Sequence, residues 1–152
     1  IKTLFYELLD ILSQVQSVED FTNAKKQITN KITEYVKKVE GKEIPLSELA
    51  FNVMISKAPS EYVKTVPQHI RAAKLLESIR EIKKGDIISY VKIINKPGVK
   101  PVEMARQDEI DSKKYMEFME STLDQITSSM DLDFDTILGK PKQTGLDQFF
   151  WN

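Results

Sequence analysis

The first 41 residues carry apolar side chains at helical spacing, and this feature constrains the fold most. Leu8 and Leu12 lie four positions apart, as neighbours on one face of a helix do, within an apolar stripe that predicts a helix over residues 3–15. Ser17, with an acidic residue three positions later, is typical of a helix N-cap and predicts a second helix that ends at Gly41. The short link between the two helices predicts an antiparallel helical hairpin.

The pattern changes after Pro45, where apolar and polar residues alternate as they do in a half-buried strand. The predicted elements that follow are a strand over 49–56, a loop over 57–67, a helix over 68–85, a strand over 87–94, a turn over 95–101, and a helix that Asp111 caps and that extends to Met130. We therefore expect an α+β fold that is mostly helical. Its parts are a helical hairpin (1–41), an α+β body with a short β-sheet (42–138) and a flexible C-terminal tail (139–152).

Composition excludes several classes of protein and of site. The 152 residues include no Cys and one His, His69, which excludes disulfides, thiolate zinc sites, Cys nucleophiles and metal sites with two His ligands. No apolar run approaches the roughly 20 residues of a membrane span, and the N-terminal segment lacks the basic start of a secretory leader. We therefore expect a cytoplasmic protein with no membrane partner. Because the chain begins with Ile1 rather than Met, we expect it to be part of a longer protein or a processed form.

Charge is unevenly distributed along the chain, although the net charge is only -1. Residues 51–100 hold 10 Lys and Arg against 4 Asp and Glu, whereas residues 101–152 hold 5 basic and 11 acidic residues. A basic middle between a nearly neutral and an acidic end predicts a local contact with a polyanion. A solvated face of lysines explains the same distribution, and charge alone leaves both interpretations open.

The last residues, KPKQTGLDQFFWN, combine aromatic side chains with Gly and Pro. Gln143, Leu146 and Phe149 lie three positions apart, so a single 3₁₀ turn places them on one side, and Phe150 adds a second aromatic anchor. An exposed segment of this kind needs a pocket on a partner. The spacing resembles the PIP box, the peptide by which replication proteins bind the sliding clamp PCNA, so these four residues are predicted to bind the clamp. A tail that packs against the core is the alternative.

A series of short residue blocks lies between positions 50 and 126. They are SK (56–57), EYVK (61–64), QHIRAAKLL (68–76), GDIISYV (85–91), KPVEMA (100–105) and ID (110–111) followed by Tyr115. In their order these blocks resemble the thumb domain of family B DNA polymerases. Together with the clamp peptide, they make the chain resemble the C-terminal thumb of an archaeal, crenarchaeal-like replicative DNA polymerase. The helical hairpin fits the palm-to-thumb segment of that family.

Basic and aromatic residues near the start of the predicted helix over 68–85 are the candidates for contact with duplex DNA. Lys and Arg neutralise phosphates without reading the sequence, and the N–H groups at a helix start add partial positive charge. The candidate DNA-binding residues are Lys57, Tyr62, Lys64, His69, Arg71 and Lys74. For His69 a local hydrogen bond in the core is an equal alternative, and Tyr62 and Tyr90 are of a type that is common in cores.

Catalytic residues are not expected in this chain. Asp131, Asp133 and Asp135 have the spacing of a calcium loop, but Thr136 and Lys142 replace the Gly and Glu that such a loop needs. Capping of a short helical turn, with the apolar residues between the aspartates packed inward, is the favoured interpretation. The resemblance places the catalytic aspartates and their Mg²⁺ cofactor on the palm of the parent polymerase, so we expect no metal site and no cofactor in this chain.

The resemblance implies that the chain is the thumb of a DNA-directed DNA polymerase, a nucleotidyltransferase of DNA replication. It would grip primer–template duplex DNA by its backbone, contact the palm and other domains of the parent polymerase, and tether the enzyme to the clamp at the nucleoid. Two other interpretations stay open. One is a free-standing clamp-associated adaptor that binds nucleic acid without polymerase activity, and the other is a structural helical domain whose lysines are solvated.

Overall fold

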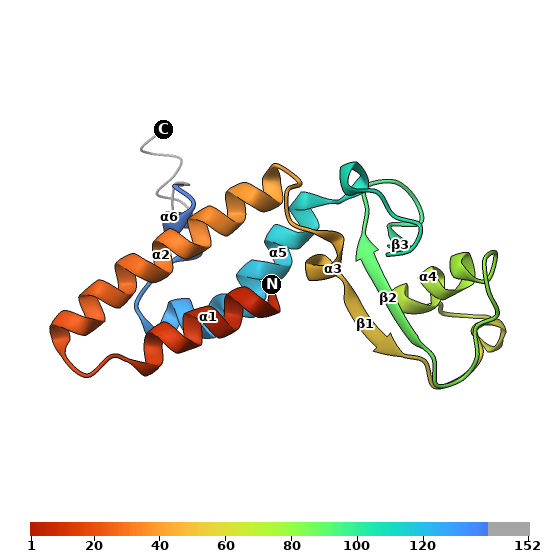
Figure 1. Ribbon diagram of the computed structural model, residues 1–152, viewed down its shortest axis with the longest axis horizontal. Coiled ribbons are helices and arrows are strands. Elements are labelled where there is room, and N and C mark those ends of the chain that lie inside the picture. Colours follow the sequence, from red (N-terminus) through yellow and green to blue (C-terminus); the bar gives the residue numbers. More distant parts are fainter. Residues whose placement is uncertain (140–152) are drawn as a thin grey trace, which may run out of the picture. The chain divides into compact units, whose positions relative to one another are not determined.

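A computed structural model describes residues 1–139 of the chain. Contacts divide the chain into two compact units (Figure 1). Within residues 1–139, the sheet unit consists of Ile1 and Lys38–Met116, and the helical unit consists of Lys2–Lys37 and the residues from Glu117 to the end of the described chain. The division falls within two helices, α2 (Val18–Glu40) and α5 (Ser112–Ser129), and the domain boundaries predicted at residues 41 and 138 stay predictions.

The fold is α+β and mostly helical, which confirms the predicted class. The other elements are α1 (Lys2–Ser13), α3 (Leu46–Leu49), β1 (Phe51–Met54), η1 (Pro59–Glu61), α4 (Gln68–Leu76), β2 (Ile87–Lys92), β3 (Val99–Pro101), η2 (Gln107–Glu109) and α6 (Phe134–Ile137). Within the described part of the chain, no helix combines the length and the apolar character needed to cross a membrane.

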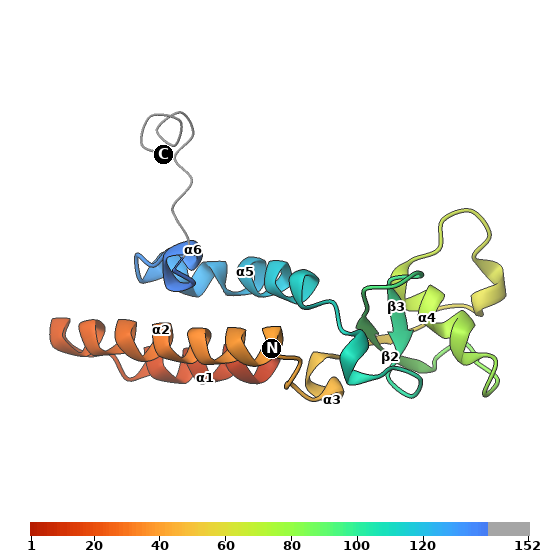
Figure 2. The ribbon, with the colours of Figure 1, turned by 90° about the horizontal axis from the view of Figure 1, so that it is seen from above.

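The helical unit contains α1, α6, and the parts of α2 and α5 on its side of the division. α1 and α2 are antiparallel, and α5 lies along one side of this pair in Figures 1 and 2. The predicted apolar stripes form the core, in which Leu8, Ile28 and Leu123 are fully buried. The Oγ of Ser17 accepts a hydrogen bond of 3.0 Å from the N–H of Asp20 and so caps α2. The predicted hairpin and its N-cap are confirmed.

The sheet unit is built on an antiparallel sheet in the order β1-β2-β3, and β1 and β2 lie within the two predicted strands. Tyr90 on β2 lies opposite Phe51 on β1 and Pro101 on β3. The sheet and α4 share a core of Ile55, Ile70, Ala72, Ala73, Leu76, Ile82, Ile88, Tyr90 and Val99. Because α4 buries one face against the sheet, its polar side chains Arg71 and Lys74 are exposed.

The predicted helix over 68–85 was too long, since α4 ends at Leu76. Apolar residues continue at helical spacing beyond this point, but Ile82 is buried in the sheet core while Ile79 is 62% exposed. The carboxylate of Asp86 accepts a hydrogen bond of 2.8 Å from a main-chain N–H in the preceding turn, and Gly85 adopts a φ of 92°. Both features favour a turn over continued helix, and Ile82 enters the core from the irregular segment just before this turn.

Two short elements, α3 and β3, are not among the predicted helices and strands. α3 begins directly after Pro45, a residue whose fixed φ suits a helix start. β3 occupies the last part of the predicted turn over 95–101 and, among the described strands, pairs with β2 alone, so it is an edge strand that tolerates Pro101. With 4 and 3 residues, these elements are too short to show an apolar period.

Candidate nucleic-acid interface

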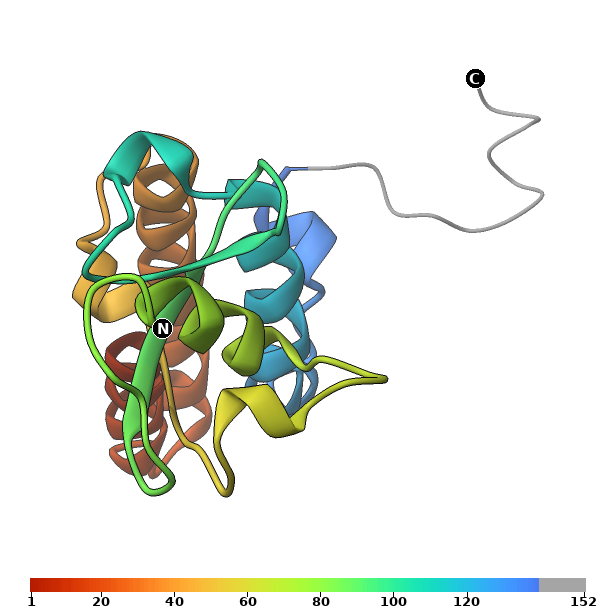
Figure 3. The same ribbon diagram turned by 90° about the vertical axis from the view of Figure 1, so that its right-hand side faces the viewer.

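Four cations of the sheet unit lie on α4 and on the segment before it, and we call them the basic cluster: Lys57, Lys64, Arg71 and Lys74. Figure 3 shows η1, the loop that follows it and α4 in yellow to lime. Arg71 and Lys74 are three positions apart and therefore share one face of α4. All four side chains are exposed, so the cluster presents its charge to solvent.

Tyr62 lies between two members of the basic cluster. The Lys57 Nζ is 4.5 Å from the centroid of the Tyr62 ring, a cation–π distance. The Lys74 Nζ donates a hydrogen bond of 3.2 Å to the main-chain carbonyl of Tyr62. The ring itself is half-buried and packs against the core between the sheet and α4. The structure thus brings together three of the predicted DNA-binding residues.

The loop between β2 and β3 also reaches the basic cluster. Arg71 donates a hydrogen bond of 3.3 Å from a guanidinium nitrogen to the main-chain carbonyl of Pro97. Lys96, the neighbour of Pro97 in the chain, is exposed and adds a cation that sequence reasoning missed. The sequence feature that could have indicated Lys96 is its position in a Pro/Gly turn within the basic segment 51–100.

Several carboxylates of the sheet unit pair with cations outside the basic cluster. Ion pairs join Arg80 to Glu103, Lys83 to Glu81, Lys100 to Glu109, and Arg106 to Asp108 and Glu109. The Lys100 Nζ lies 2.6 Å from a Glu109 oxygen, and this hydrogen bond lowers the pKa of Glu109 despite the opposing effect of burial. Within residues 1–139, no member of the basic cluster pairs with a carboxylate, so their charge can attract an external anion.

The candidate His69 and the aromatic residue Tyr90 differ in burial. His69 is half-buried in the first turn of α4, whose start at Gln68 agrees with the prediction. Tyr90 is buried in the core of the sheet unit, and this burial raises the pKa of its phenol. Tyr90 is therefore a core residue, as the sequence favoured.

The acidic segment after α5 forms a helical turn. Asp133 occupies the N-cap position of α6, but its Oδ2 accepts a hydrogen bond of 3.1 Å from the Thr136 hydroxyl and caps no main-chain N–H. Phe134 is buried, as predicted, whereas Leu132 is only half-buried. Among the described residues, no three His, Cys, Asp or Glu side chains are arranged to hold a metal ion.

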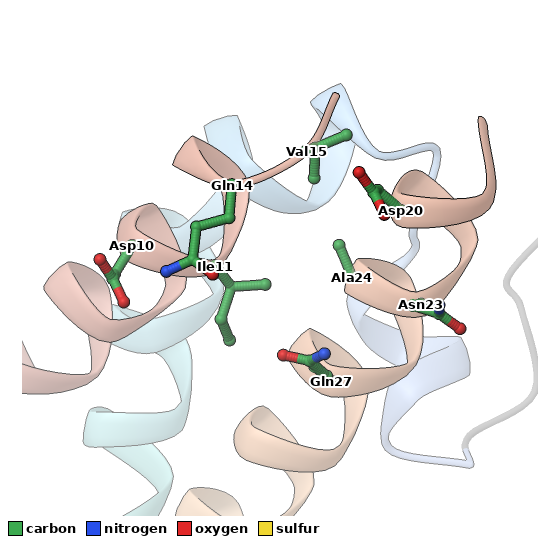
Figure 4. A pocket seen from close by; sticks show the side chains of 8 residues that line it. All are labelled: Asp10, Ile11, Gln14, Val15, Asp20, Asn23, Ala24 and Gln27. Carbon is green, nitrogen blue, oxygen red and sulfur yellow. The ribbon is translucent and has the colours of Figure 1, made fainter. Parts of the chain in front are cut away.

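A polar groove of about 280 Å³ lies between the end of α1 and the start of α2 (Figure 4). It is lined by Asp10, Ile11, Gln14, Val15, Asp20, Asn23, Ala24 and Gln27. The carboxylate of Asp20 accepts a hydrogen bond of 3.1 Å from the N–H of Gln16, which ties the link between the helices to α2. Because each helix contributes a carboxylate, the groove repels phosphate and does not belong to the candidate interface.

The predicted clamp-binding residues Gln143, Leu146, Phe149 and Phe150 lie outside the described residues. The candidate interface therefore consists of the basic cluster, Tyr62, His69 and Lys96.

Comparison with known proteins assigns the chain to a family. The model of DNA polymerase family B matches residues 1–136. "DNA polymerase 1" of Saccharolobus solfataricus is 36% identical over 151 residues, which cover 99% of this chain and 17% of that protein. "DNA polymerase 1" of Aeropyrum pernix is 36% identical over 143 residues, which cover 93% of this chain and 15% of that protein. The chain thus spans about a sixth of the length of the curated relatives it matches.

A solved structure supports the same fold. The family B DNA polymerase of the hyperthermophilic archaeon Pyrobaculum calidifontis matches 75% of this chain and 15% of its own, with a TM-score of 0.61 and 19% identity. These findings confirm the resemblance to archaeal family B polymerases that the sequence blocks indicate. Since the family model and relatives of more than 30% identity cover nearly all of it, the chain belongs to DNA polymerase family B.

Proposed function

We propose that this chain is the thumb of a family B DNA polymerase and that its basic cluster grips primer–template duplex DNA by the backbone. The observation that carries the proposal is the unpaired charge of the cluster. Its four exposed cations lie on α4 and the preceding segment. Each ion pair of the sheet unit within residues 1–139 joins a carboxylate to a cation outside the cluster. The cations of the cluster neutralise phosphates without first breaking an ion pair within the protein.

The chemistry of the cluster suits a polymerase, which must hold DNA of any sequence. Contacts from Lys and Arg to phosphates position a protein on the duplex but carry no information about the bases. The interface supplies ammonium and guanidinium groups from α4, the loop before it and the loop that holds Lys96. The Mg²⁺ ions and the catalytic aspartates belong, on this proposal, to the palm of the parent polymerase, so this chain contributes duplex binding rather than catalysis.

The C-terminal residues extend the proposal to a second partner. Gln143, Leu146, Phe149 and Phe150 match the spacing of the clamp-binding peptide, so they would dock on a sliding clamp such as PCNA. The tether would raise the effective concentration of the polymerase at DNA without any new contact to the substrate.

The salt dependence of duplex binding tests the proposed contact between the basic cluster and the DNA backbone. If the chain neutralises about three to five phosphates, the logarithm of its binding constant should fall with the logarithm of salt concentration at a slope of roughly -3 to -4. Changing Lys57, Lys64 and Arg71 to Ala removes three of these charges and should bring the slope to about -1. Fluorescence anisotropy with two duplexes of unrelated sequence measures both quantities.

The control variant removes the same charge from elsewhere in the sheet unit. Lys83, Lys84 and Arg106 are exposed and lie outside the basic cluster, so changing them to Ala should leave most of the slope intact. An equal reduction of the salt slope in the two triple variants would show that duplex binding depends on net charge alone and not on the basic cluster. A salt-independent affinity, or strong preference for one duplex, would contradict the proposal.

A further inference from the structure

Two lysines of the basic cluster are held by one residue through neutral groups. Tyr62 presents its ring to Lys57, whose Nζ is 4.5 Å from the ring centroid, and its carbonyl to Lys74, whose Nζ is 3.2 Å from the oxygen. Neither contact neutralises the lysine, because a ring face and a carbonyl are both uncharged. Both ammonium groups therefore keep their full charge while their positions are restricted.

The segment that carries Tyr62 is itself fixed. The N–H of Ala58 donates a hydrogen bond of 2.8 Å to the Glu61 carboxylate, and the N–H of Tyr62 donates one of 3.2 Å to the carbonyl of Pro59. Pro59 is buried, and the Tyr62 ring packs against the core between α4 and the sheet. The ring and the carbonyl thus have set positions relative to α4, where Lys74 lies.

Each ammonium group retains donors for a ligand. A lysine has three N–H donors, so the Lys74 ammonium has two left after its bond to the Tyr62 carbonyl. The Lys57 ammonium contacts a ring on one side and is exposed on the other, where an anion can approach. A free lysine side chain loses much rotamer freedom when it binds a ligand. Lys57 and Lys74 have already lost part of this freedom in the folded protein, before DNA binds.

We infer that Tyr62 is a positioning residue that preorganises Lys57 and Lys74 as a paired contact for the backbone phosphates of duplex DNA. This inference rests on the proposed function, and it replaces the predicted direct contact of Tyr62 with DNA. Tyr62 acts through the two lysines and not through its own contact with DNA. Its hydroxyl group has no part in this role, whereas its ring is required.

The substitutions Tyr62→Phe and Tyr62→Leu separate the ring from the hydroxyl. Tyr62→Phe keeps the ring and should bind duplex DNA as the unchanged chain does. Tyr62→Leu keeps an apolar side chain for the core but removes the ring face, and should weaken binding about twofold to tenfold, the cost of ordering one long side chain on binding. The salt slope should stay the same in Tyr62→Leu because no charge is removed.

A double-mutant cycle identifies the partner of the ring. In a Lys57→Ala background, Tyr62→Leu should change the affinity by clearly less than it does alone, because the ring then has no ammonium to position. Thermal melting of each variant shows whether the fold is intact. If Tyr62→Leu melts early, Tyr62→Met supplies a second variant without a ring, and its unbranched side chain adapts to the same space.

Three outcomes overturn the inference. A loss in Tyr62→Phe equal to that in Tyr62→Leu would assign the role to the hydroxyl. An undiminished effect of Tyr62→Leu in the Lys57→Ala background would mean that the ring contacts DNA directly. Unchanged affinity of the well-folded Tyr62→Leu variant would mean that the lysines need no positioning. Salt-independent binding by the unchanged chain is a different failure, since it contradicts the proposed function before any Tyr62 variant is compared.

Discussion

At the scale of single residues, Tyr115 joins three parts of the sheet unit. It lies on α5 and is fully buried, and its hydroxyl donates a hydrogen bond of 2.9 Å to the carbonyl of Leu49. The same oxygen accepts one of 3.0 Å from the N–H of Lys92 on β2. Its ring stacks on Phe51 of β1 at a centroid distance of 6.0 Å. One hydroxyl therefore satisfies two main-chain groups of two different segments.

Tyr115→Phe should lower the free energy of unfolding by about 1–3 kcal/mol, because it takes a hydrogen-bond partner from two main-chain groups in the interior while leaving the ring in place. Urea denaturation at constant m-value measures the change. Tyr6→Phe is the matched control, since Tyr6 is 58% exposed on α1 and its variant should stay within about 0.5 kcal/mol of the unchanged chain. Equal stability of the two variants would show that the Tyr115 hydroxyl contributes nothing to the fold.

At the scale of elements, the segment between α4 and β2 shows a turn in place of a helix. The N–H of Asp86 donates a hydrogen bond of 3.0 Å to the carbonyl of Lys83, which closes a four-residue turn. Gly85, with a φ of 92°, occupies the third position of this turn, as in type II turns. Lys84 then occupies the second position, where Pro is favoured in such turns.

Lys84→Pro should therefore be tolerated and should change the free energy of unfolding by less than about 1 kcal/mol in either direction. If residues 77–85 continued α4 as the sequence predicts, the same substitution would cost about 3 kcal/mol. Lys26→Pro is the reference for a proline placed within a helix. Lys26 is a solvent-exposed residue in the middle of α2, and its replacement should lower the free energy of unfolding by about 3 kcal/mol or more. Thermal or urea denaturation of both variants distinguishes turn from helix.

The same segment explains which elements the sequence could predict. The hairpin, β1, β2 and the start of α5 follow from apolar periodicity and from caps such as Ser17 and Asp111, because these signals act within a few neighbouring residues. The end of α4 was predicted wrongly, since Ile82 continues the helical period but is buried by tertiary packing from an irregular segment. Packing in the core outweighs the local helix propensity of this segment, and a short stretch of sequence does not reveal that packing.

Prediction of the candidate site had a similar limit. Charge density identified the basic cluster, because its members lie close together in the chain. The sequence could not show that carboxylates elsewhere in the sheet unit, such as Glu103 and Glu109, pair with other cations, since this pairing depends on the fold. It also missed Lys96, which the bond from Arg71 to the Pro97 carbonyl associates with α4.

At the scale of the whole molecule, the proposed function gives the chain two partners with different chemistry. Changing Phe149 and Phe150 to Ala should cost on the order of 3 kcal/mol or more in clamp binding, roughly a hundredfold, because both rings would leave an apolar pocket. The affinity for duplex DNA and the melting temperature should not change, since on this proposal the rings bury in the clamp and not in the core of the chain. Calorimetric titration with a cognate sliding clamp measures the loss.

Asp147 and Gln148 lie between the predicted anchor positions and supply the control. Changing both to Ala alters as many residues of the same segment but should leave clamp affinity within a few-fold of the unchanged chain. Equal affinity of the double-Phe variant and the unchanged chain, or a lower melting temperature of that variant, would contradict the proposed docking.

The neutral partners of the basic cluster also bear on how a duplex moves across it. The Lys57 ammonium contacts the Tyr62 ring, and Arg71 and Lys74 donate hydrogen bonds to main-chain carbonyls. None of these neutral groups carries a negative charge that would compete with a phosphate for the cation. Each base-pair step of a sliding duplex offers these cations another phosphate of the same charge, so the free energy of the complex is nearly equal at successive registers. Advance by one register then requires no exchange of internal ion pairs. On the proposed function, such a grip holds the duplex firmly while allowing it to translocate with little resistance.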